Sequence, residues 1–331
     1  MARFAWKLRA AVYGPLILGT VSLIYLCTSM PGMSAKVAHH EASAEHRALS
    51  ARLKRDVEIL STQFIQRNLD APQQLQNAIS HLTQRLHDSG IQQVTRELVH
   101  TPDGDAHNLV GIVPGTNSVS KLAIVGAHYD TAPDTAGAND NGSGVASLLA
   151  LASRFSQSPA DRTLRFVLFA NEEPPYFGSR WMGSMVHADG CQRRGEAIEY
   201  MISLETMGYY SNVAGSQRYP FPAGLFYPTV GNFVAFVGNL SSRALVRGAL
   251  TSFRGAVDFP SEGAAFPEAV AGVGWSDHSS FWRIGVPALM VTDTALYRDP
   301  HYHKSTDSAE HLDFDSLATV VLGVEAVLRG L

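Results

Sequence analysis

Residues 122–130 read LAIVGAHYD, a short apolar run that ends abruptly in polar residues. Two later stretches repeat this pattern. LRFVLFAN at 164–171 is followed by two glutamates, and MISL at 201–204 is followed by one. Short apolar runs without regular polar alternation are typical of strands that are buried on both faces of a sheet. The pattern therefore predicts a parallel sheet with polar residues at the carboxyl ends of its strands.

The same pattern continues through the chain from residue 51 onward. Further buried strands are expected at Asn108–Val113, Phe233–Val237, Ala256–Phe259 and Ala288–Val291. Apolar residues at helical spacing predict helices over 51–66, 73–89, 145–155 and 314–331. Strands that alternate with amphipathic helices indicate an α/β fold in which helices cover both faces of a largely parallel sheet.

Histidine and carboxylate side chains stand where the predicted strands end. His128 and Asp130 follow the first apolar run, and Glu205 follows the third. Glu172 and Glu173 follow the second run as an adjacent pair. Because parallel strands end at the same edge of a sheet, we expect these side chains to lie close together.

Two further segments supply side chains of the same kinds. Asp140 lies in the glycine-rich turn GANDNGSG, and DPHYH at 299–303 follows the last predicted strand. Each residue alone also has an ordinary explanation, such as a buried histidine, a turn aspartate or a solvated glutamate pair. Histidines and carboxylates from these separate segments together suit two cations that share a bridging carboxylate. These ligand types favour zinc, or manganese or cobalt, over calcium or copper.

Six motifs in order along the chain resemble those of the M28 family of zinc aminopeptidases. They are GAHYD, GANDNGSG, FANEE, SLETMGYY, SDHSSFW and YHKSTDSAEHLD. The resemblance covers roughly residues 50–331. It implies a three-layer α/β/α sandwich around a central mixed, largely parallel sheet, and a centre that binds two metal ions.

The resemblance also implies which residues hold the metals. His128 and Glu205 would hold one zinc ion. Glu173 and His303 would hold the other, and Asp140 would bridge the two. Many family members carry aspartate where this chain has Glu205, whereas others carry glutamate as here. Manganese or cobalt in place of zinc is compatible with the same ligands.

Three catalytic roles follow from the same resemblance. Glu172 is the expected general base and acid. Asp130 is expected to orient the imidazole of His128, with a strand-end cap as the alternative. Tyr302 matches a position that helps to hold the oxyanion in some relatives, with simple packing as the alternative.

Two ambiguities concern histidines near the expected centre. His301 competes with His303 for the last ligand position, and the family pattern selects the histidine that directly follows an aromatic residue and stands four before Asp307. Asp277 and His278 are expected to line the site by resemblance, without an assigned role.

The predicted function is that of a two-zinc aminopeptidase acting on peptides with a free N-terminus. Two cations would lower the pKa of a bridging water and polarise the scissile carbonyl, while a glutamate moves the proton. One alternative is a glutaminyl-cyclase-like acyltransferase with a single zinc, and another is an inactive M28-like binding protein. A metal content of two, one or none per chain would separate these alternatives.

Composition excludes several other classes of protein. The 331 residues include 26 Lys plus Arg and 30 Asp plus Glu, which gives a net charge of -4 without a basic block. We therefore expect no nucleic-acid partner. The two cysteines stand far apart, at positions 27 and 191, so a disulfide scaffold and a cysteine-based metal site are excluded as well.

The N-terminal region is expected to lie outside the catalytic fold. Residues 10–30 form an apolar run long enough to cross a bilayer, and three basic residues precede it within residues 1–9. This pattern predicts a cytoplasmic N-terminus, a single-pass signal anchor, a tether at 31–50 and an extracytoplasmic catalytic domain at 51–331. A cleaved signal peptide is the alternative.

Overall fold

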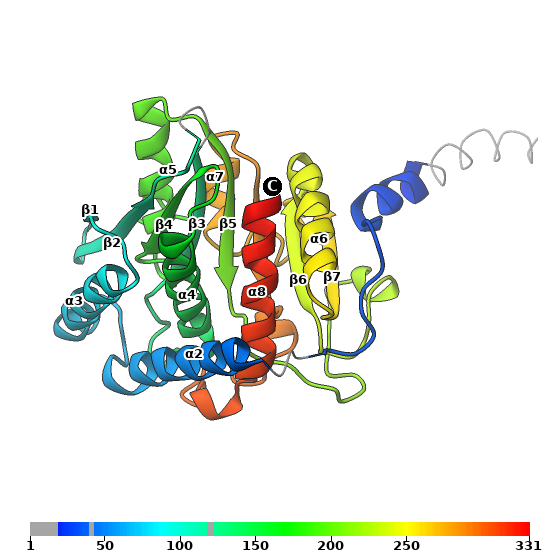
Figure 1. The fold of residues 1–331 in the computed structure, drawn as a ribbon, viewed down its shortest axis with the longest axis horizontal. Helices are drawn as coiled ribbons and strands as arrows, with labels where there is room; N and C mark the ends of the chain where they lie inside the picture. The colour runs from blue at the N-terminus through cyan, green and yellow to red at the C-terminus, as the bar shows by residue number, and fades with distance from the viewer. Residues whose placement is uncertain (1–18, 40–42, 118–121) are drawn as a thin grey trace, which may run out of the picture.

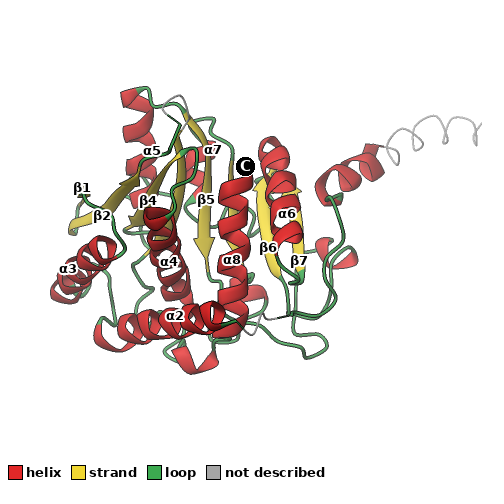
Figure 2. Cartoon of the chain, viewed as in Figure 1, coloured by secondary structure: helices red, strands yellow, loops and turns green. Residues whose placement is uncertain are grey.

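The computed structural model describes residues 19–39, 43–117 and 122–331 (Figure 1). Within these residues the chain forms one eight-stranded sheet with helices on both faces, as the strand and helix colours of Figure 2 show. The order across the sheet is β1-β2-β4-β3-β5-β8-β6-β7. The strands are β1 (Val94–Thr101), β2 (Gly104–Val113), β3 (Leu122–His128), β4 (Thr163–Phe169), β5 (Ile198–Glu205), β6 (Val234–Asn239), β7 (Ser261–Phe266) and β8 (Ala288–Thr292).

Parallel pairing occupies the centre of this sheet. β3 pairs in parallel with β4 and with β5, and β5 pairs in parallel with β8. On one side, β2 runs antiparallel to β4 and to β1. On the other side, β6 runs antiparallel to β8 and parallel to β7. The prediction of a mixed, largely parallel sheet is confirmed.

Helices cover the sheet in two layers. The face nearer the viewer in Figure 1 carries α2 (Ala44–Gln63), α3 (Pro72–Asp88), α4 (Gly144–Gln157), α6 (Arg243–Ala256) and α8 (Phe314–Gly330). The opposite face carries α5 (Gly183–Arg194) and α7 (His278–Trp282). A separate apolar cluster, which includes Phe169, Cys191 and Phe281, fills the space beneath these two helices. The expected α/β/α sandwich is therefore confirmed.

One predicted strand is wrong. Ala256–Phe259 was expected to be a strand, but Ala256 is the last residue of α6, and the edge strand β7 begins only at Ser261. The apolar residue Phe259 is explained by packing outside the strand, because its ring contacts that of Tyr210, at 5.3 Å between centroids. β7 itself contains Gly263, Ala264 and Ala265, residue types that carry little strand preference, so its sequence gave no signal.

The N-terminal region is described only from Gly19 onward. Residues 19–28 are helical, and no helix among the described residues is long and apolar enough to cross a membrane. Residues 10–18 of the expected anchor lie outside the described residues. The expected tether at 31–50 includes the first residues of α2, which begins at Ala44 and buries Leu49.

Residues 26–34 lie against α6 and β7 through a row of arginines. Arg243 donates to the carbonyl of Leu26, and Arg247 donates to the carbonyl of Ser29 at 2.6 Å. Arg254 donates to the carbonyl of Pro31 at 2.7 Å. The backbone N–H of Ser261 donates to the hydroxyl of Ser34 at 2.8 Å. These contacts fix the segment to the outer edge of the sheet.

Removing this segment is expected to lower thermal stability. A chain that lacks residues 1–35 loses the arginine contacts and the Ser34 contact, whereas a chain that lacks residues 1–18 keeps them. Each half-exposed hydrogen bond contributes about 0.5–1.5 kcal/mol, so we expect the shorter chain to melt about 5–10 °C lower. Differential scanning calorimetry of the two chains makes the comparison, and equal melting temperatures would contradict it.

Candidate metal centre

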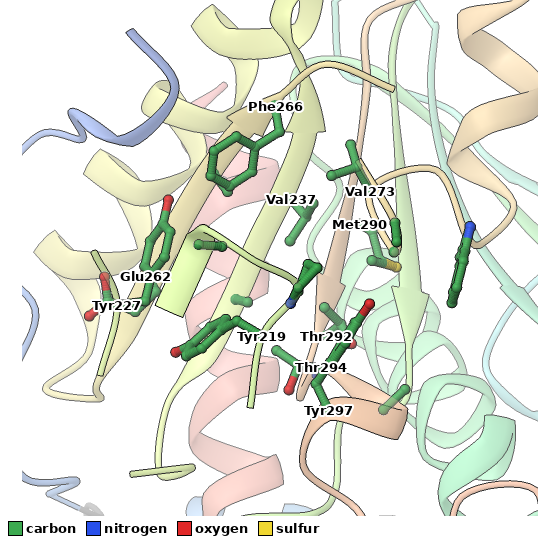
Figure 3. Close-up of a pocket in the computed structure, with 18 of the residues that line it drawn as sticks. Tyr219, Tyr227, Val237, Glu262, Phe266, Val273, Met290, Thr292, Thr294 and Tyr297 are labelled. Atoms are coloured by element: carbon green, nitrogen blue, oxygen red, sulfur yellow. The ribbon is translucent and has the colours of Figure 1, made fainter. Parts of the chain in front are cut away.

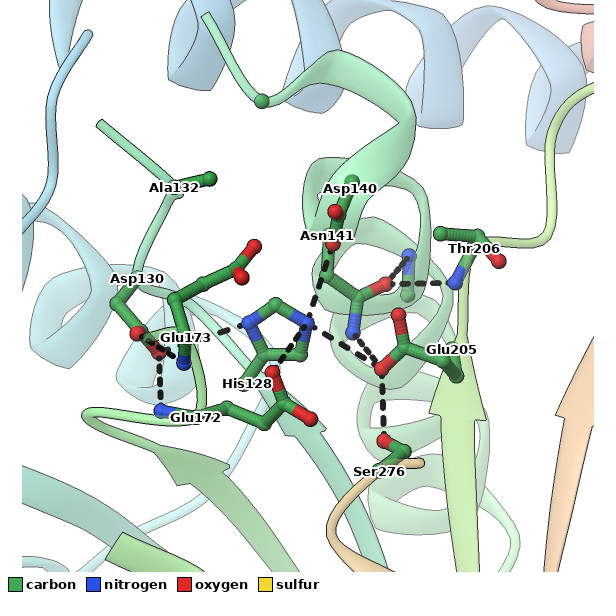
Figure 4. A network of polar contacts seen from close by, with 12 residues as sticks. His128, Asp130, Ala132, Asp140, Asn141, Glu172, Glu173, Glu205, Thr206 and Ser276 are labelled. Atoms are coloured by element: carbon green, nitrogen blue, oxygen red, sulfur yellow. Dashed lines mark hydrogen bonds and ion pairs between the residues drawn. The ribbon is translucent and has the colours of Figure 1, made fainter. Parts of the chain in front are cut away.

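The candidate residues are gathered at the carboxyl ends of three parallel strands. His128 is the last residue of β3, and Glu205 is the last residue of β5. Glu172 and Glu173 lie just beyond the end of β4, which runs between β2 and β3. Figure 4 shows these side chains converging beneath the loop that carries Asp140. The expectation that strand ends bring these residues together agrees with their position.

The first group of converging atoms comprises His128, Asp140 and Glu205. Nε2 of His128 lies 3.3 Å from a carboxylate oxygen of Asp140 and 3.2 Å from one of Glu205. All three residues are buried. Their three ligand atoms lie close enough together to surround a single metal ion.

The second group comprises Asp140, Glu173 and His303. Nε2 of His303 lies 3.0 Å from the second carboxylate oxygen of Asp140 and 3.1 Å from an oxygen of Glu173. Asp140 therefore belongs to both groups, with one oxygen facing each. His301 instead stacks on His311, at 3.8 Å between ring centroids, so it is His303 that faces the carboxylates.

Glu172 and Tyr302 border these groups. An oxygen of Glu172 lies 3.9 Å from Nε2 of His128, and the residue is buried. The ring of Tyr302 stacks on that of His303, at 4.0 Å between centroids, and lines the cavity beside Glu205.

Asp130 connects two of the strand ends. Its two carboxylate oxygens accept the backbone N–H groups of Glu172 and Glu173, at 3.1 and 3.0 Å. One of these oxygens also lies 3.5 Å from Nδ1 of His128. Asp130 is thus placed to hold both the glutamate pair and the imidazole in position.

Asp130→Asn is expected to weaken zinc binding about 10- to 100-fold while the fold is kept, because an amide offers only one acceptor to the two N–H groups. Competition with a chelating dye measures the affinity. The matched control is Asp105→Asn, which changes an exposed aspartate beside His100. An Asp130 variant with the affinity of that control would contradict the positioning role.

Burial and charge perturb the titration of the group. Burial raises the pKa of Glu173 to about 8, and the Asp140 carboxylate adds to this rise. Burial opposes the protonated form of His303, yet the carboxylates of Asp140 and Glu173 raise its pKa to about 10. Burial also raises the pKa of Glu172 well above its ordinary value, although His128 offsets part of the rise. Buried carboxylates that lie this close together repel one another, and a bound cation would compensate their charge.

The unpaired atoms of the centre fit a metal. Among the described residues, both ring nitrogens of His128, Oδ2 of Asp140 and Oε1 of Glu173 are buried without a hydrogen-bond partner. Ligand atoms held tetrahedrally at about 2.0–2.1 Å from zinc lie about 3.3 Å apart. The separations of 3.2 and 3.3 Å around His128 match that spacing. These atoms are therefore spaced as zinc ligands and do not form hydrogen bonds with one another.

Several supporting residues were missed from the sequence. The hydroxyl of Ser276 donates to Glu205 at 2.7 Å, and the amide of Asn141 donates to the carbonyl of Leu204 at 2.9 Å. Asp307, expected only as a spacing marker, accepts the backbone N–H groups of Asn139 and Asp140. The position of Asp307 in the turn after His303 was a usable signal. For Ser276 and Asn141 the sequence offers no sign of a supporting role, apart from their occurrence in the motifs SDHSSFW and GANDNGSG.

Arg67 is the least expected of these residues. It is fully buried, and its guanidinium donates to five backbone carbonyls, those of Leu60, Phe64, Tyr129, Ala136 and Gly137. Burial lowers the pKa of Arg67 to about 10, and nearby carboxylates oppose that fall. Gly137 has a φ of 65°, and a side chain there would meet the guanidinium at 2.7 Å. This arginine holds the loop between His128 and Asp140.

The backbone is strained at three positions in or directly beside the candidate site. Asn171, Thr206 and His303 have φ values of 56°, 40° and 55°, in the region that side chains other than glycine rarely adopt. Asn171 precedes Glu172, and Thr206 follows Glu205. Strain of this kind concentrates at functional sites, where the surrounding structure maintains it.

Asp277 and His278 lie near the centre but outside both groups. Asp277 is fully buried, and burial raises its pKa to about 7, opposed by the charge of His128. A ring nitrogen of His278 contacts the carbonyl of Val273 at 2.8 Å, and the ring meets that of Trp282 edge-on. Burial lowers the pKa of His278 to about 4, so this imidazole is neutral at pH 7.

An α/β/α sandwich that gathers buried histidines and carboxylates at the ends of its parallel strands has the features of a metal-dependent hydrolase. Residues 108–328 match the sequence profile of peptidase family M28. The chain belongs to this family. It is 35% identical to the Escherichia coli K12 protein YfbL, which is itself uncharacterised, over 86% of this chain and 90% of that protein.

More distant relatives include fungal leucine aminopeptidases. A probable leucine aminopeptidase of Trichophyton verrucosum is 28% identical over 65% of this chain and 55% of its own length. The chain therefore spans about half the length of that relative.

Solved structures share the fold at low identity. LapB from Legionella pneumophila has a TM-score of 0.68 at 19% identity, over 94% of this chain and 81% of its own. The zinc aminopeptidase BSAP from Bacillus subtilis has a TM-score of 0.54 at 23% identity, over 69% of this chain and 50% of its own. A glutaminyl cyclase from Tannerella forsythia has a TM-score of 0.60 at 19% identity, over 86% and 98%. Family and neighbours together imply zinc as the metal.

Proposed function

We propose that this protein is a two-zinc aminopeptidase that hydrolyses the N-terminal peptide bond of unblocked peptides. The observation that carries this proposal is the position of Asp140. One of its oxygens faces His128 and the other faces His303, so a single carboxylate joins two groups of ligand atoms. A shared carboxylate of this kind suits a pair of cations.

Each ion would be held by one histidine and one glutamate together with Asp140. His128 and Glu205 hold the first ion, and Glu173 and His303 hold the second. When bound, the zinc ions lower the pKa of a water molecule and polarise the scissile carbonyl. Manganese and cobalt accept the same ligands. Ser276 and Asn141 support the first group, because both donate to the side chain of Glu205.

Glu172 is the proposed proton carrier. Its carboxylate is buried at the border of both groups, and burial together with the neighbouring carboxylates raises its pKa. A carboxyl with a raised pKa takes a proton from the attacking water and later gives it to the leaving amine. This role leaves Glu173, the adjacent residue, free to act as a ligand.

Tyr302 is the proposed oxyanion donor. Its ring is fixed by stacking on His303, and it lines the cavity beside Glu205. Burial and the nearby Asp140 raise the pKa of its phenol, so the hydroxyl keeps its proton and remains a donor. A donor in this position stabilises the charge that develops on the carbonyl oxygen.

A matched pair of substrates tests the function. The excess of buried carboxylates attracts a free α-ammonium, and an acetyl group removes that charge and adds bulk. We expect an aminoacyl amide to be hydrolysed and its N-acetylated form to be a poor substrate, in protein with two zinc ions per chain by mass spectrometry of metals. Equal hydrolysis of both forms would mean that the protein is not an aminopeptidase.

Glutaminyl cyclisation is the second candidate, because the cyclase from Tannerella forsythia shares the fold over most of this chain. That reaction predicts a single zinc ion and conversion of glutaminyl peptides to pyroglutamyl peptides without loss of a residue. The two-ion proposal predicts release of free glutamine from the same peptides. Chromatography of one glutaminyl peptide after incubation separates the two outcomes.

We also propose an extracytoplasmic position for the catalytic domain, with residues 10–30 as a membrane anchor. Support comes from the uncharged apolar run and the three basic residues before it. Protease added to intact cells, or to spheroplasts where an outer membrane blocks access, is expected to degrade the domain. Protection of the domain until the membrane is broken would contradict this orientation.

A further inference from the structure

A large cavity adjoins the candidate metal centre. It encloses about 890 Å³, including the part open to solvent, and Glu205 and Tyr302 line it at the metal end. Figure 3 shows Glu262 and Tyr227 together at one side of this cavity, with Met290 and Val273 toward the other. The cavity thus extends from the metal centre across the sheet to its edge.

The floor of the cavity is a single row of paired residues. Glu205 on β5 pairs with Thr292 on β8, and Thr292 pairs with Ala235 on β6. Ala235 in turn pairs with Glu262 on the edge strand β7. Neighbouring strands lie about 4.8 Å apart, so the two glutamates stand about 14 Å from each other. Small side chains lie between two carboxylates on one face.

Glu262 is a carboxylate without a partner. It is half-buried, and it makes no hydrogen bond or ion pair with any residue in the part of the chain that the structure describes. Burial raises its pKa, and Arg254 offsets part of the rise. The guanidinium of Arg254 is occupied by the hydroxyl of Ser261 and the carbonyl of Pro31. A half-buried carboxylate in this situation favours a cationic ligand.

Aromatic rings line the cavity together with Glu262. The rings of Tyr219 and Tyr227 are stacked at 5.8 Å between centroids, and the ring of Phe266 meets Tyr227 edge-on at 6.3 Å. The hydroxyls of both tyrosines donate to backbone carbonyls, those of Pro228 and Gly263. The two tyrosines therefore offer a ligand no free O–H donor, and what remains are acceptor oxygens and aromatic faces, which attract ammonium and guanidinium groups.

We propose that this cavity receives the side chain of the substrate's N-terminal residue and that Glu262 selects arginine and lysine there. The proposal rests on the aminopeptidase function proposed above. An extended arginine side chain spans about 7 Å from its Cα to its terminal nitrogens, whereas leucine ends about 3.9 Å from its Cα. A long basic side chain runs along the apolar floor and brings its charge to Glu262. A leucine side chain stops short and leaves the carboxylate unpaired.

The first experiment uses the unaltered protein and isosteric substrates. Arginyl amide is compared with citrullyl amide, a pair that differs in charge and hardly in shape. Lysyl amide is compared with norleucyl amide, which lacks only the terminal ammonium group. A hydrogen bond from an ionised donor is about twice as strong as one from a neutral donor, so kcat/KM should be about 10-fold or more higher for the charged member. Equal values within each pair, or a preference for the neutral member, would overturn the role of Glu262.

The second experiment changes the carboxylate. In Glu262→Gln, we expect the ratio of kcat/KM for arginyl over citrullyl amide to fall by about 10-fold or more. The matched control, Glu58→Gln, removes the same charge from the exposed face of α2 and should keep the wild-type ratio. An Arg/Cit ratio in Glu262→Gln equal to that of the control would overturn the proposal. A misfolded variant leaves the isosteric substrates as the deciding test.

The outcomes also separate this inference from the function on which it rests. Hydrolysis of norleucyl amide as fast as lysyl amide defeats the selection by Glu262 but leaves the aminopeptidase intact. Failure to hydrolyse any unblocked aminoacyl amide, with both zinc ions present, defeats the aminopeptidase and the inference together.

Discussion

Glu172→Gln is expected to bind two zinc ions and to lose activity about 10²- to 10⁴-fold, because general acid–base catalysis contributes about that much. Glutamine has nearly the same shape but cannot accept the proton from water. The proposed ligand Glu173 and the hydrogen bonds from both backbone N–H groups to Asp130 are untouched. The measurement is kcat on an aminoacyl amide together with metal content.

The rate and the metal content together decide this prediction. Loss of zinc from Glu172→Gln would instead show that Glu172 is a ligand. Its carboxylate oxygen lies 3.9 Å from Nε2 of His128, a distance at which both atoms could bind one ion. A rate near that of the wild type, with zinc retained, would show that another group moves the proton.

Asp140→Ala is expected to lose at least one zinc ion and all measurable activity. Each of the two proposed ligand sets depends on one oxygen of this carboxylate, whereas the remaining cluster of possible ligand atoms, that of His128, Glu172 and Glu173, does not include it. Its removal leaves His128 and Glu205 on one side and Glu173 and His303 on the other without a common ligand. Metal content after extensive dialysis measures the loss.

A control for this variant lies in the same loop. Asp134 is exposed, bonds to Gln66 and has a φ of 58°, a value that asparagine tolerates better than alanine does. Asp134→Asn should therefore keep both ions and the wild-type rate. Full zinc occupancy in purified Asp140→Ala would refute the bridging role.

The residues that the sequence predicts best are those set by strand ends. His128 and Glu205 are terminal residues of parallel strands, and a short apolar run followed by a polar residue locates both. His303 lies in an irregular turn, so its distinction from His301 depended on resemblance to family motifs rather than on a periodic pattern. In the structure, His303 faces Asp140 and His301 stacks on His311.

Other features depend on contacts between distant segments, which local patterns do not encode. Ser276 reaches Glu205 across 71 positions of the chain, and a serine carries no sign of this partner. The edge strand β7 is held by pairing with β6 and not by the preference of its small residues. The cavity behind Glu205 arises because this strand places Ala264 and Glu262 on its floor.

The guanidinium of Arg67 also bears on where the catalytic unit begins. The match to peptidase family M28 starts at residue 108, yet the five carbonyls bonded by Arg67 include three between Tyr129 and Gly137. A chain cut at the start of that match would leave buried carbonyls without donors, next to the loop that carries Asp140. The smallest unit that folds on its own therefore includes α2 and Arg67. Its N-terminal boundary lies before residue 108, where the match to the family begins.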